Sequence, residues 1–175
     1  MANRNLSLII DADIARSSGT TEHPVSSGSR AILDSVKNNK HKIVMCPLLF
    51  AEWKKHNSVF AKRWLSSMIA KKQVQFVKPN SNTKEHIEEH ILDEKIKAIS
   101  IKDAHLIDAA LHGDKIIASN DDNARNAFII ISGNYKCINE IVWFNAIKDR
   151  DFIEDFFVSG KFIPKSYYLK EAVNG

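Results

Sequence analysis

The sequence predicts an α/β protein, a three-layer α/β/α sandwich with a central parallel sheet and a short C-terminal extension. Short β-branched apolar runs alternate with longer segments of helical periodicity, which is the element order of parallel sheets. These runs are unbroken, as in strands that are buried on both faces. With 175 residues, 44% of them apolar, the chain can build one domain around a hydrophobic core.

The first half of the chain alternates strands with helices. Leu8, Ile9 and Ile10 form the first apolar run, and the Ser/Thr/Gly/Pro-rich stretch that follows is typical of a loop. Pro47 suits the first turn of a helix, and Ser58 can cap the next one. We predict strands at residues 6–11, 42–46 and 74–77, a loop at 17–29, and helices at 30–38, 48–56 and 58–72.

The second half continues this alternation and then becomes less regular. Gly113 is well placed to end a helix, and the apolar run after it predicts a strand. We predict helices at 82–98 and 100–112, a strand at 115–118, an edge strand at 140–144 and a short helix at 150–158. Residues 1–133 would form the main domain, and residues 134–175 an extension packed on or beside it.

Charge and cysteine content narrow the class of protein. A formal charge of +4 and a pI near 9.0 are compatible with a polyanionic partner such as nucleic acid. Cys46 and Cys137 show no paired or metal-binding spacing, which indicates reduced thiols in a cytoplasmic protein. No stretch approaches the roughly 18 apolar residues of a membrane helix, so we expect a soluble protein with no membrane partner.

Carboxylates follow two of the predicted strands directly. Asp11 ends the first apolar run, and Asp121 comes shortly after the run at 115–118. The carboxyl ends of parallel strands meet at one edge of the sheet, which is where α/β proteins bind ligands. We therefore expect the two acids to belong to one site.

Two further acids fall on apolar helix faces. On the helix predicted at 100–112, a step of about 100° per residue puts Asp103 inside the apolar arc and Asp108 on the polar side. The spacing of Asp103 from Ser100 also matches a capping box. Glu52 follows Leu48 by four residues and Leu49 by three, and so is expected to share their inward face, with an ion pair to Lys55 or His56 as the structural alternative.

The chemistry of these acids favours a divalent cation. A buried carboxylate is costly unless a cation or hydrogen bonds compensate it, and several together repel one another. Oxygen ligands without paired histidine or cysteine suit Mg²⁺ or Mn²⁺ rather than zinc. Such cations commonly act beside phosphate groups.

These residues resemble the PIN domains, a family of metal-dependent nucleases with an α/β/α sandwich. The family pattern is an Asp that ends the first strand, a Glu on the helix after the second strand, an Asp opening a later helix, and a Ser/Thr-x-Asp ending the following strand. The resemblance spans residues 7–128. Its four motifs here are Leu8-Ile9-Ile10-Asp11, Pro47-Leu48-Leu49-Phe50-Ala51-Glu52, Lys102-Asp103-Ala104-His105-Leu106-Ile107 and Ser119-Asn120-Asp121.

The resemblance implies an endoribonuclease in which Asp11, Glu52, Asp103 and Asp121 hold one or two Mg²⁺ or Mn²⁺ ions. The products would carry 5′-phosphate and 3′-hydroxyl ends. Single-domain PIN proteins of this size often serve as the toxin of a toxin-antitoxin pair or as another defence effector. The expected partners are RNA, an antitoxin or other protein, and a second copy of the chain.

Other residues are secondary candidates for this site. Ser119 could orient Asp121 or a water, and Asp13 would add an acid on the side of Asp11 if the strand continues. Asp122 and Arg125 are candidates for the rim, although such a pair one helical turn apart is also ordinary helix decoration. Four basic residues after Glu52 could contact phosphates, but the same residues are also expected on an ordinary solvent-exposed helix face: Lys54, Lys55, Lys62 and Arg63.

Three alternatives stay open. Trp53 and Trp64 could stack on bases, but their helical spacing favours the core. His86-Ile87-Glu88-Glu89-His90 matches the zinc motif H-x-x-E-H without a recognisable third ligand, so we interpret it as a solvated helix. The whole chain could also be a non-catalytic PIN-like binding or assembly module, with an aromatic tail that docks a partner.

Overall fold

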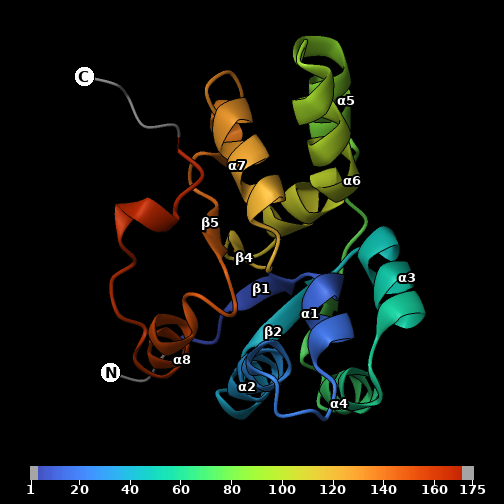
Figure 1. Ribbon diagram of the computed structural model, residues 1–175, viewed down its shortest axis with the longest axis vertical. Coiled ribbons are helices and arrows are strands. Elements are labelled where there is room, and N and C mark those ends of the chain that lie inside the picture. The colour runs from blue at the N-terminus through green and yellow to red at the C-terminus, as the bar shows by residue number, and fades with distance from the viewer. Residues whose placement is uncertain (1–3, 171–175) are drawn as a thin grey trace.

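The computed structural model describes residues 4–170 as five parallel strands between layers of helices (Figure 1). The three-layer sandwich predicted from the sequence is confirmed. The spatial order is β3-β2-β1-β4-β5. The strands are β1 Ser7–Ile10, β2 Lys42–Met45, β3 Val74–Phe76, β4 Ile116–Ala118 and β5 Val142–Phe144.

Helices cover both faces of this sheet. In Figure 1, α5, α6 and α7 lie on one side, and α1, α2, α4 and α8 lie on the other. Helix α3 contacts both α1 and α6. The bounds are α1 Ala12–Ser17, α2 Pro24–Asn38, α3 Pro47–His56, α4 Val59–Ala70, α5 Asn82–His90, α6 Glu94–Ala110, α7 Asp122–Ile131 and α8 Arg150–Ser159. None of the helices in residues 4–170 has the length and apolar character needed to cross a membrane.

The strand order contains a topological switch point between β1 and β4. From β1 the chain moves outward through β2 and β3, then crosses over to β4 and β5 on the other side. Ile10 pairs with Ala118, and the Asp11 amide donates to the Ala118 carbonyl at 3.0 Å. In open α/β sheets, ligands bind at this kind of point, beyond the carboxyl ends of the strands.

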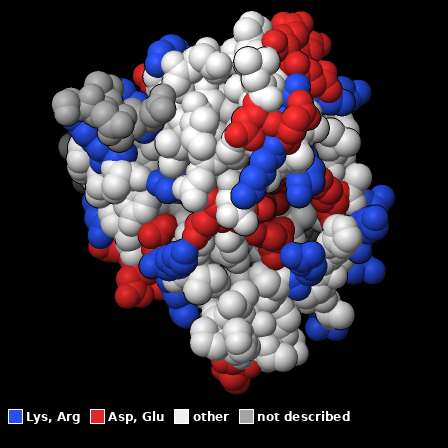
Figure 2. Space-filling model, turned by 45° about the horizontal axis from the view of Figure 1, so that its top comes forward, with Lys and Arg blue, Asp and Glu red and all other residues white. Residues whose placement is uncertain are grey.

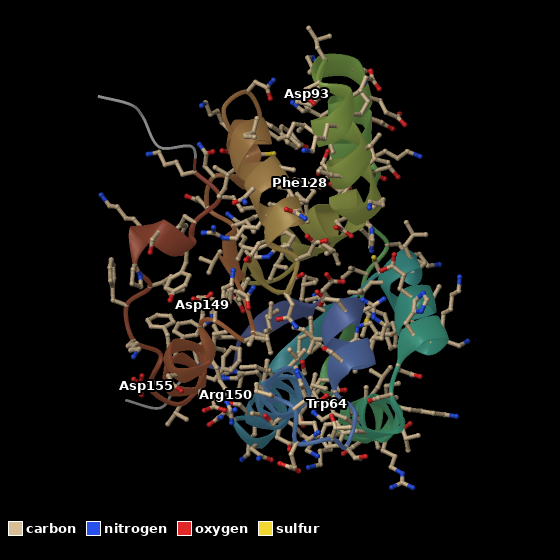
Figure 3. All side chains as sticks on the ribbon, in the orientation of Figure 1. Trp64, Asp93, Phe128, Asp149, Arg150 and Asp155 are labelled. Atoms are coloured by element: carbon tan, nitrogen blue, oxygen red, sulfur yellow. The ribbon has the colours of Figure 1, made fainter. Side chains whose placement is uncertain are left out.

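Two tryptophans fix α3 and α4 in the core. The Trp53 indole N–H donates to the Ile10 carbonyl at 2.9 Å, and that of Trp64 donates to the Leu33 carbonyl at 2.7 Å. Their rings stack with centroids 5.7 Å apart, and both side chains are buried. Trp64 points inward between α2 and α4 (Figure 3). The prediction that both are core residues is confirmed, and neither is exposed for a base to stack on.

The segment after β1 is more helical than predicted. Helix α1 was not predicted, and α2 begins at Pro24 rather than near residue 30. The small residues that suggested a loop are used for close packing instead: a Cβ at Gly28 would lie 3.0 Å from Ile147 Cδ1, and Ser29 is buried. The His23 ring caps the first turn of α2 by accepting from Val25 N.

The break between α5 and α6 also lies earlier than predicted. It falls at residues 91–93, where Asp93 (Figure 3) accepts hydrogen bonds from Lys95 N and Ile96 N and caps α6. Ser100 and Asp103 therefore lie well inside a continuous helix. A capping role for the Ser100–Asp103 pair is thereby excluded.

The chain after residue 133 contributes to the same sheet. Strand β5 pairs with β4 as the predicted edge strand, and α8 packs against α2. Val142 forms an antiparallel bridge with Tyr168, which returns the tail to the sheet. Asp149, at the start of α8 (Figure 3), accepts from Asn145 N at 2.8 Å and holds the turn before that helix.

Candidate functional site

An acidic pocket lies at the switch point of the sheet. Its volume is about 200 Å³. Figure 2 shows acidic side chains gathered around a hollow in the middle of one face, between basic side chains. The pocket brings together all four acids expected from the sequence and one secondary candidate; its lining is Asp11, Ala12, Asp13, Arg16, Glu52, His56, Asp103 and Asp121.

Ser119 links the two strand ends that form the floor of the site. Its hydroxyl donates to Asp11 Oδ2 at 2.7 Å and lies 3.3 Å from Asp13 Oδ2. The same oxygen accepts from the Asp121 amide at 3.1 Å. Ser119 therefore positions Asp11 and the Asp121 backbone, rather than the Asp121 carboxylate that the sequence suggested as its target.

Asp13 lies in the first turn of α1, because the strand ends at Ile10. Its Oδ2 accepts from Asn120 N at 2.9 Å, whereas its buried Oδ1 has no hydrogen-bond partner among residues 4–170. Burial, followed by the charge of Asp11, raises the pKa of Asp13 to about 7. Burial likewise raises the pKa of Asp11, against the hydrogen bond from Ser119. The floor of the pocket is thus short of compensating positive charge.

Asp103 reaches the pocket from α6. Burial and then the charge of Asp11 raise its pKa to about 7. The prediction that Asp108 lies on a polar, solvated side of the helix is wrong, because α5 packs there. Asp108 is buried and accepts from Thr83 Oγ1 at 2.6 Å and from Thr83 N at 3.1 Å.

Glu52 is held by a histidine that the sequence analysis did not single out. His105 Nε2 lies 3.0 Å from Glu52 Oε2, and the His105 side chain is buried. Burial lowers the pKa of His105, but the hydrogen bond and charge of Glu52 outweigh it, and the net shift is upward. Glu52 does not share the inward face of both leucines: Leu49 is buried, but Leu48 is 63% exposed. The one sequence signal for His105 was its place two residues after Asp103.

The acids after β4 have different roles. Asp121 caps α7, with Oδ1 accepting from Ala124 N at 2.9 Å, and its side chain lines the pocket. Asp122 points the other way, where Lys148 and Asn145 bind it. The hydrogen bond from Lys148 lowers the pKa of Asp122. Asp122 therefore joins α7 to the C-terminal extension.

The basic residues that reach the pocket differ from the predicted ones. Arg16, in the last turn of α1, and His56, at the end of α3, line it. Arg125 donates to the Ser166 carbonyl at 2.6 Å and so binds the tail. The remaining candidates are exposed and are not part of the pocket lining: Lys54, Lys55, Lys62 and Arg63.

The two histidines of the H-x-x-E-H segment stack against each other on α5. His90 is exposed and His86 is half-buried; their ring centroids lie 4.5 Å apart, and Tyr135 also stacks on His86, at 4.1 Å. His86 Nε2 lies 3.2 Å from Asn134 Oδ1. The two histidines thus pack an aromatic stack against the turn after α7.

The pocket has the right donors for a hard divalent cation. Its acids supply only oxygen ligands, and the buried Asp13 Oδ1 offers one oxygen that no described protein group uses. Across residues 4–170, no three acid, histidine or cysteine side chains are grouped so that they could hold a metal ion as they stand. The oxygen donors and negative charge of the pocket suit Mg²⁺ or Mn²⁺. To bind such an ion together, some of the four acid side chains would have to change conformation: Asp11, Glu52, Asp103 and Asp121.

Comparisons with protein-family models, curated proteins and solved structures find no match to this chain.

Proposed function

We propose that the protein is a Mg²⁺- or Mn²⁺-dependent endoribonuclease of the PIN type. One observation carries the proposal: Asp11, Glu52, Asp103 and Asp121 come from four separate parts of the sequence and line one pocket at the switch point. These are the four positions that the resemblance to PIN domains requires. Clustering acids around one hollow is unfavourable in itself, so a bound cation gives the arrangement a physical reason.

The residues of the pocket divide into two groups. Asp11, Glu52, Asp103 and Asp121 would hold the cation, which would stabilise charge on the scissile phosphate and make a bound water more acidic. Ser119 keeps one oxygen of Asp11 in place, and His105 does the same for Glu52. The other oxygen of each of these two carboxylates would then be available to the cation.

Positive charge at the wall would orient the substrate. Arg16 carries a planar guanidinium suited to a phosphodiester, and His56 lies on the α3 side of the same hollow. Both line the pocket beside the acids, so a phosphate bound there would lie between the Arg16 guanidinium and the cation, with the His56 ring as a further hydrogen-bonding group. This assigns the substrate contacts to Arg16 and His56 in place of Lys54, Lys55, Lys62, Arg63 and Arg125.

The test is cleavage of labelled single-stranded RNA in Mg²⁺, Mn²⁺ or EDTA. We expect metal-dependent cleavage by the parent protein and none by Asp11→Asn or Asp103→Asn. Asp108→Asn is the matched control, because Asp108 is a buried acid on the same helix as Asp103 but does not line the pocket. The amide oxygen of asparagine can keep the hydrogen bonds that Asp108 Oδ1 accepts from Thr83. Undiminished cleavage by purified Asp11→Asn would remove the proposal. DNA of the same sequence in parallel reactions decides the substrate class.

Metal binding can also be followed without cleavage. A cation that binds only the folded state at a hundredfold excess over its Kd adds about 2.7 kcal/mol to stability. Mg²⁺ or Mn²⁺ should therefore raise the Tm of the parent protein relative to EDTA, and should raise that of Asp103→Asn much less. A parent protein that neither cleaves nucleic acid nor responds to metal would favour the non-catalytic binding module.

A toxin or defence role rests on the same proposal. It predicts that expression of the chain alone arrests growth and that Asp11→Asn restores it. A protein that inhibits the parent and binds both forms would then be the antitoxin expected in the cytoplasm. Growth arrest that persists with Asp11→Asn would separate toxicity from the pocket.

A further inference from the structure

A second hollow lies at the opposite edge of the sheet and is lined by lysines. It has a volume of about 490 Å³ and is located where β2 and β3 begin, at the ends of α2 and α4. None of its lining residues is acidic: they are Asn5, Lys37, Asn38, Lys40, Lys42, Lys71, Lys72 and Gln73. We call this surface the lysine hollow.

Most of the charge in the lysine hollow is not neutralised by the protein. Lys37 approaches Asp34 at 3.9 Å across one helical turn. The other four lysines form no ion pair with any residue in the range 4–170, and their side chains are exposed; they are Lys40, Lys42, Lys71 and Lys72. Positive side chains at the C-terminal ends of α2 and α4 stabilise these helices through the helix dipole. Five lysines around one concavity are more than two helix ends need.

Two of these lysines occupy backbone positions that favour glycine. Lys40 has φ 59° and Lys72 has φ 57°, in the left-handed region where helices commonly end on glycine. Each lies in the turn that ends its helix, and the two turns have the same form. After α2, His41 N donates to Val36 O, and after α4, Gln73 N donates to Met68 O. Lysine is strained at such a position relative to glycine. Glycine can therefore replace both lysines without backbone strain, which allows the charge to be removed without loss of stability.

We propose that the lysine hollow binds the phosphate backbone of a nucleic acid, at a site separate from the acidic pocket. Lysines are point charges, and here they come from two helix ends and a strand start, which suits a chain of phosphates better than one anion. The hollow is also larger than the acidic pocket. Because phosphate contacts set position and not sequence, the site would hold nucleic acid without base preference.

The two sites lie at opposite ends of the same strands. Ser7 and Lys42 pair at the start of β1 and β2, and Asp11 follows the end of β1. The separation along β1 is roughly 13 Å of strand. An acidic pocket repels phosphates until cations fill it, whereas the lysine hollow attracts them at any metal concentration. Binding at the hollow therefore does not depend on the nuclease proposal, and it can be measured in EDTA.

The test is the salt dependence of binding to a labelled oligouridylate in EDTA. For a single strand, log affinity falls with log salt concentration, and each lost phosphate contact makes this slope less steep by about 0.7. The slope of the Lys40→Gly/Lys72→Gly double variant should therefore be less steep than that of the parent protein by about 1.4. Glycine suits both backbone positions, so the double variant should melt at or above the Tm of the parent protein. Weaker binding by a protein that is at least as stable is the expected signature.

Lys115→Gly is the matched control. Lys115 has φ 59°, but its ammonium group pairs with Glu140 at 2.6 Å and does not line the hollow. Its variant should keep the parental salt slope. Lys42→Gln with Lys71→Gln tests the same hollow without any change at a left-handed position, and should also weaken binding.

Three results would overturn the proposal. One is a double variant whose salt slope matches that of the parent protein or of Lys115→Gly. Another is free phosphate or pyrophosphate that displaces the oligouridylate as effectively as unlabelled RNA at equal phosphate concentration, which would indicate a small-anion site. The third is polyglutamate that binds more tightly than RNA of similar charge, which would indicate an acidic protein segment.

Discussion

Asp13→Asn should stabilise the metal-free protein at neutral pH, although it replaces a half-buried residue in the first turn of α1. The carboxylate that it removes has one buried oxygen with no partner among the described residues, and lies close enough to Asp11 to feel its charge. The asparagine amide oxygen can still accept from Asn120 N, and the new N–H₂ group would take the place of the unpartnered Oδ1. The change therefore removes a charge and keeps the hydrogen bond.

The size of the effect follows from the pKa. Burial and the charge of Asp11 raise the pKa of Asp13 from 3.8 to about 7, so the folded protein holds this proton more tightly than the unfolded chain does. The stability from that proton is complete below pH 3.8 and is lost as pH rises through 7. The full loss would be about 4 kcal/mol. Water and counter-ions that enter the pocket should reduce it to about 2 kcal/mol.

The assay is urea denaturation in EDTA at a series of pH values from acid to mildly alkaline. Fluorescence reports unfolding, because all three tryptophans are buried: Trp53, Trp64 and Trp143. We expect the stability of Asp13→Asn relative to the parent protein to rise with pH, reaching an advantage of about 2 kcal/mol above pH 7. Asp34→Asn, which neutralises a half-exposed acid on α2 away from the pocket, is the control for the loss of one negative charge. A constant difference across the pH range, or a variant that is less stable at high pH, would refute the reasoning.

Three further predictions concern single contacts. Asp108→Ala leaves the buried Thr83 amide and hydroxyl without their acceptor, and should lower the free energy of unfolding by about 2 kcal/mol in urea titrations; no loss would mean that these bonds contribute little. Trp53→Phe removes the indole donor to the Ile10 carbonyl at the end of β1, and should lower stability by about 1 to 3 kcal/mol; an unchanged urea midpoint would count against that role. His105→Phe should lower kcat for RNA cleavage about 10- to 100-fold, whereas His105→Gln, which keeps a donor, should retain more activity; equal losses in both would show that the hydrogen bond is not what matters.

The order of strands and helices could be predicted because it depends on local patterns. The apolar runs at β1 and β4 identify buried strands, and the acids after them identify the edge where a site would form. The first crossover was harder, because glycine and serine serve loops and tight packing equally well. Gly28 lies inside α2 against Ile147 of the C-terminal extension, and that contact joins residues about 120 positions apart.

Side-chain partners were less predictable than the positions of the acids. His105 reaches Glu52 across 53 residues of sequence, and Arg125 reaches the Ser166 carbonyl across 41. Nothing in the local periodicity specifies either contact. A charged residue near a motif is therefore a poor guide to the substrate, since Arg125 binds the tail and Arg16 lines the pocket.

Asp103 and Asp108 show what a helical wheel can and cannot indicate. The wheel separates the two acids correctly, but it assumes one buried face, whereas α6 packs against the sheet on one side and against α5 on another. Asp108 is buried and Asp103 is half-buried, and burial raises the pKa of each. What distinguishes them is compensation: Asp108 has two hydrogen bonds from Thr83, and Asp103 faces other carboxylates across a hollow. Burial of an acid alone therefore does not indicate a binding site. It does so when the protein supplies no hydrogen bond or positive charge to compensate the carboxylate.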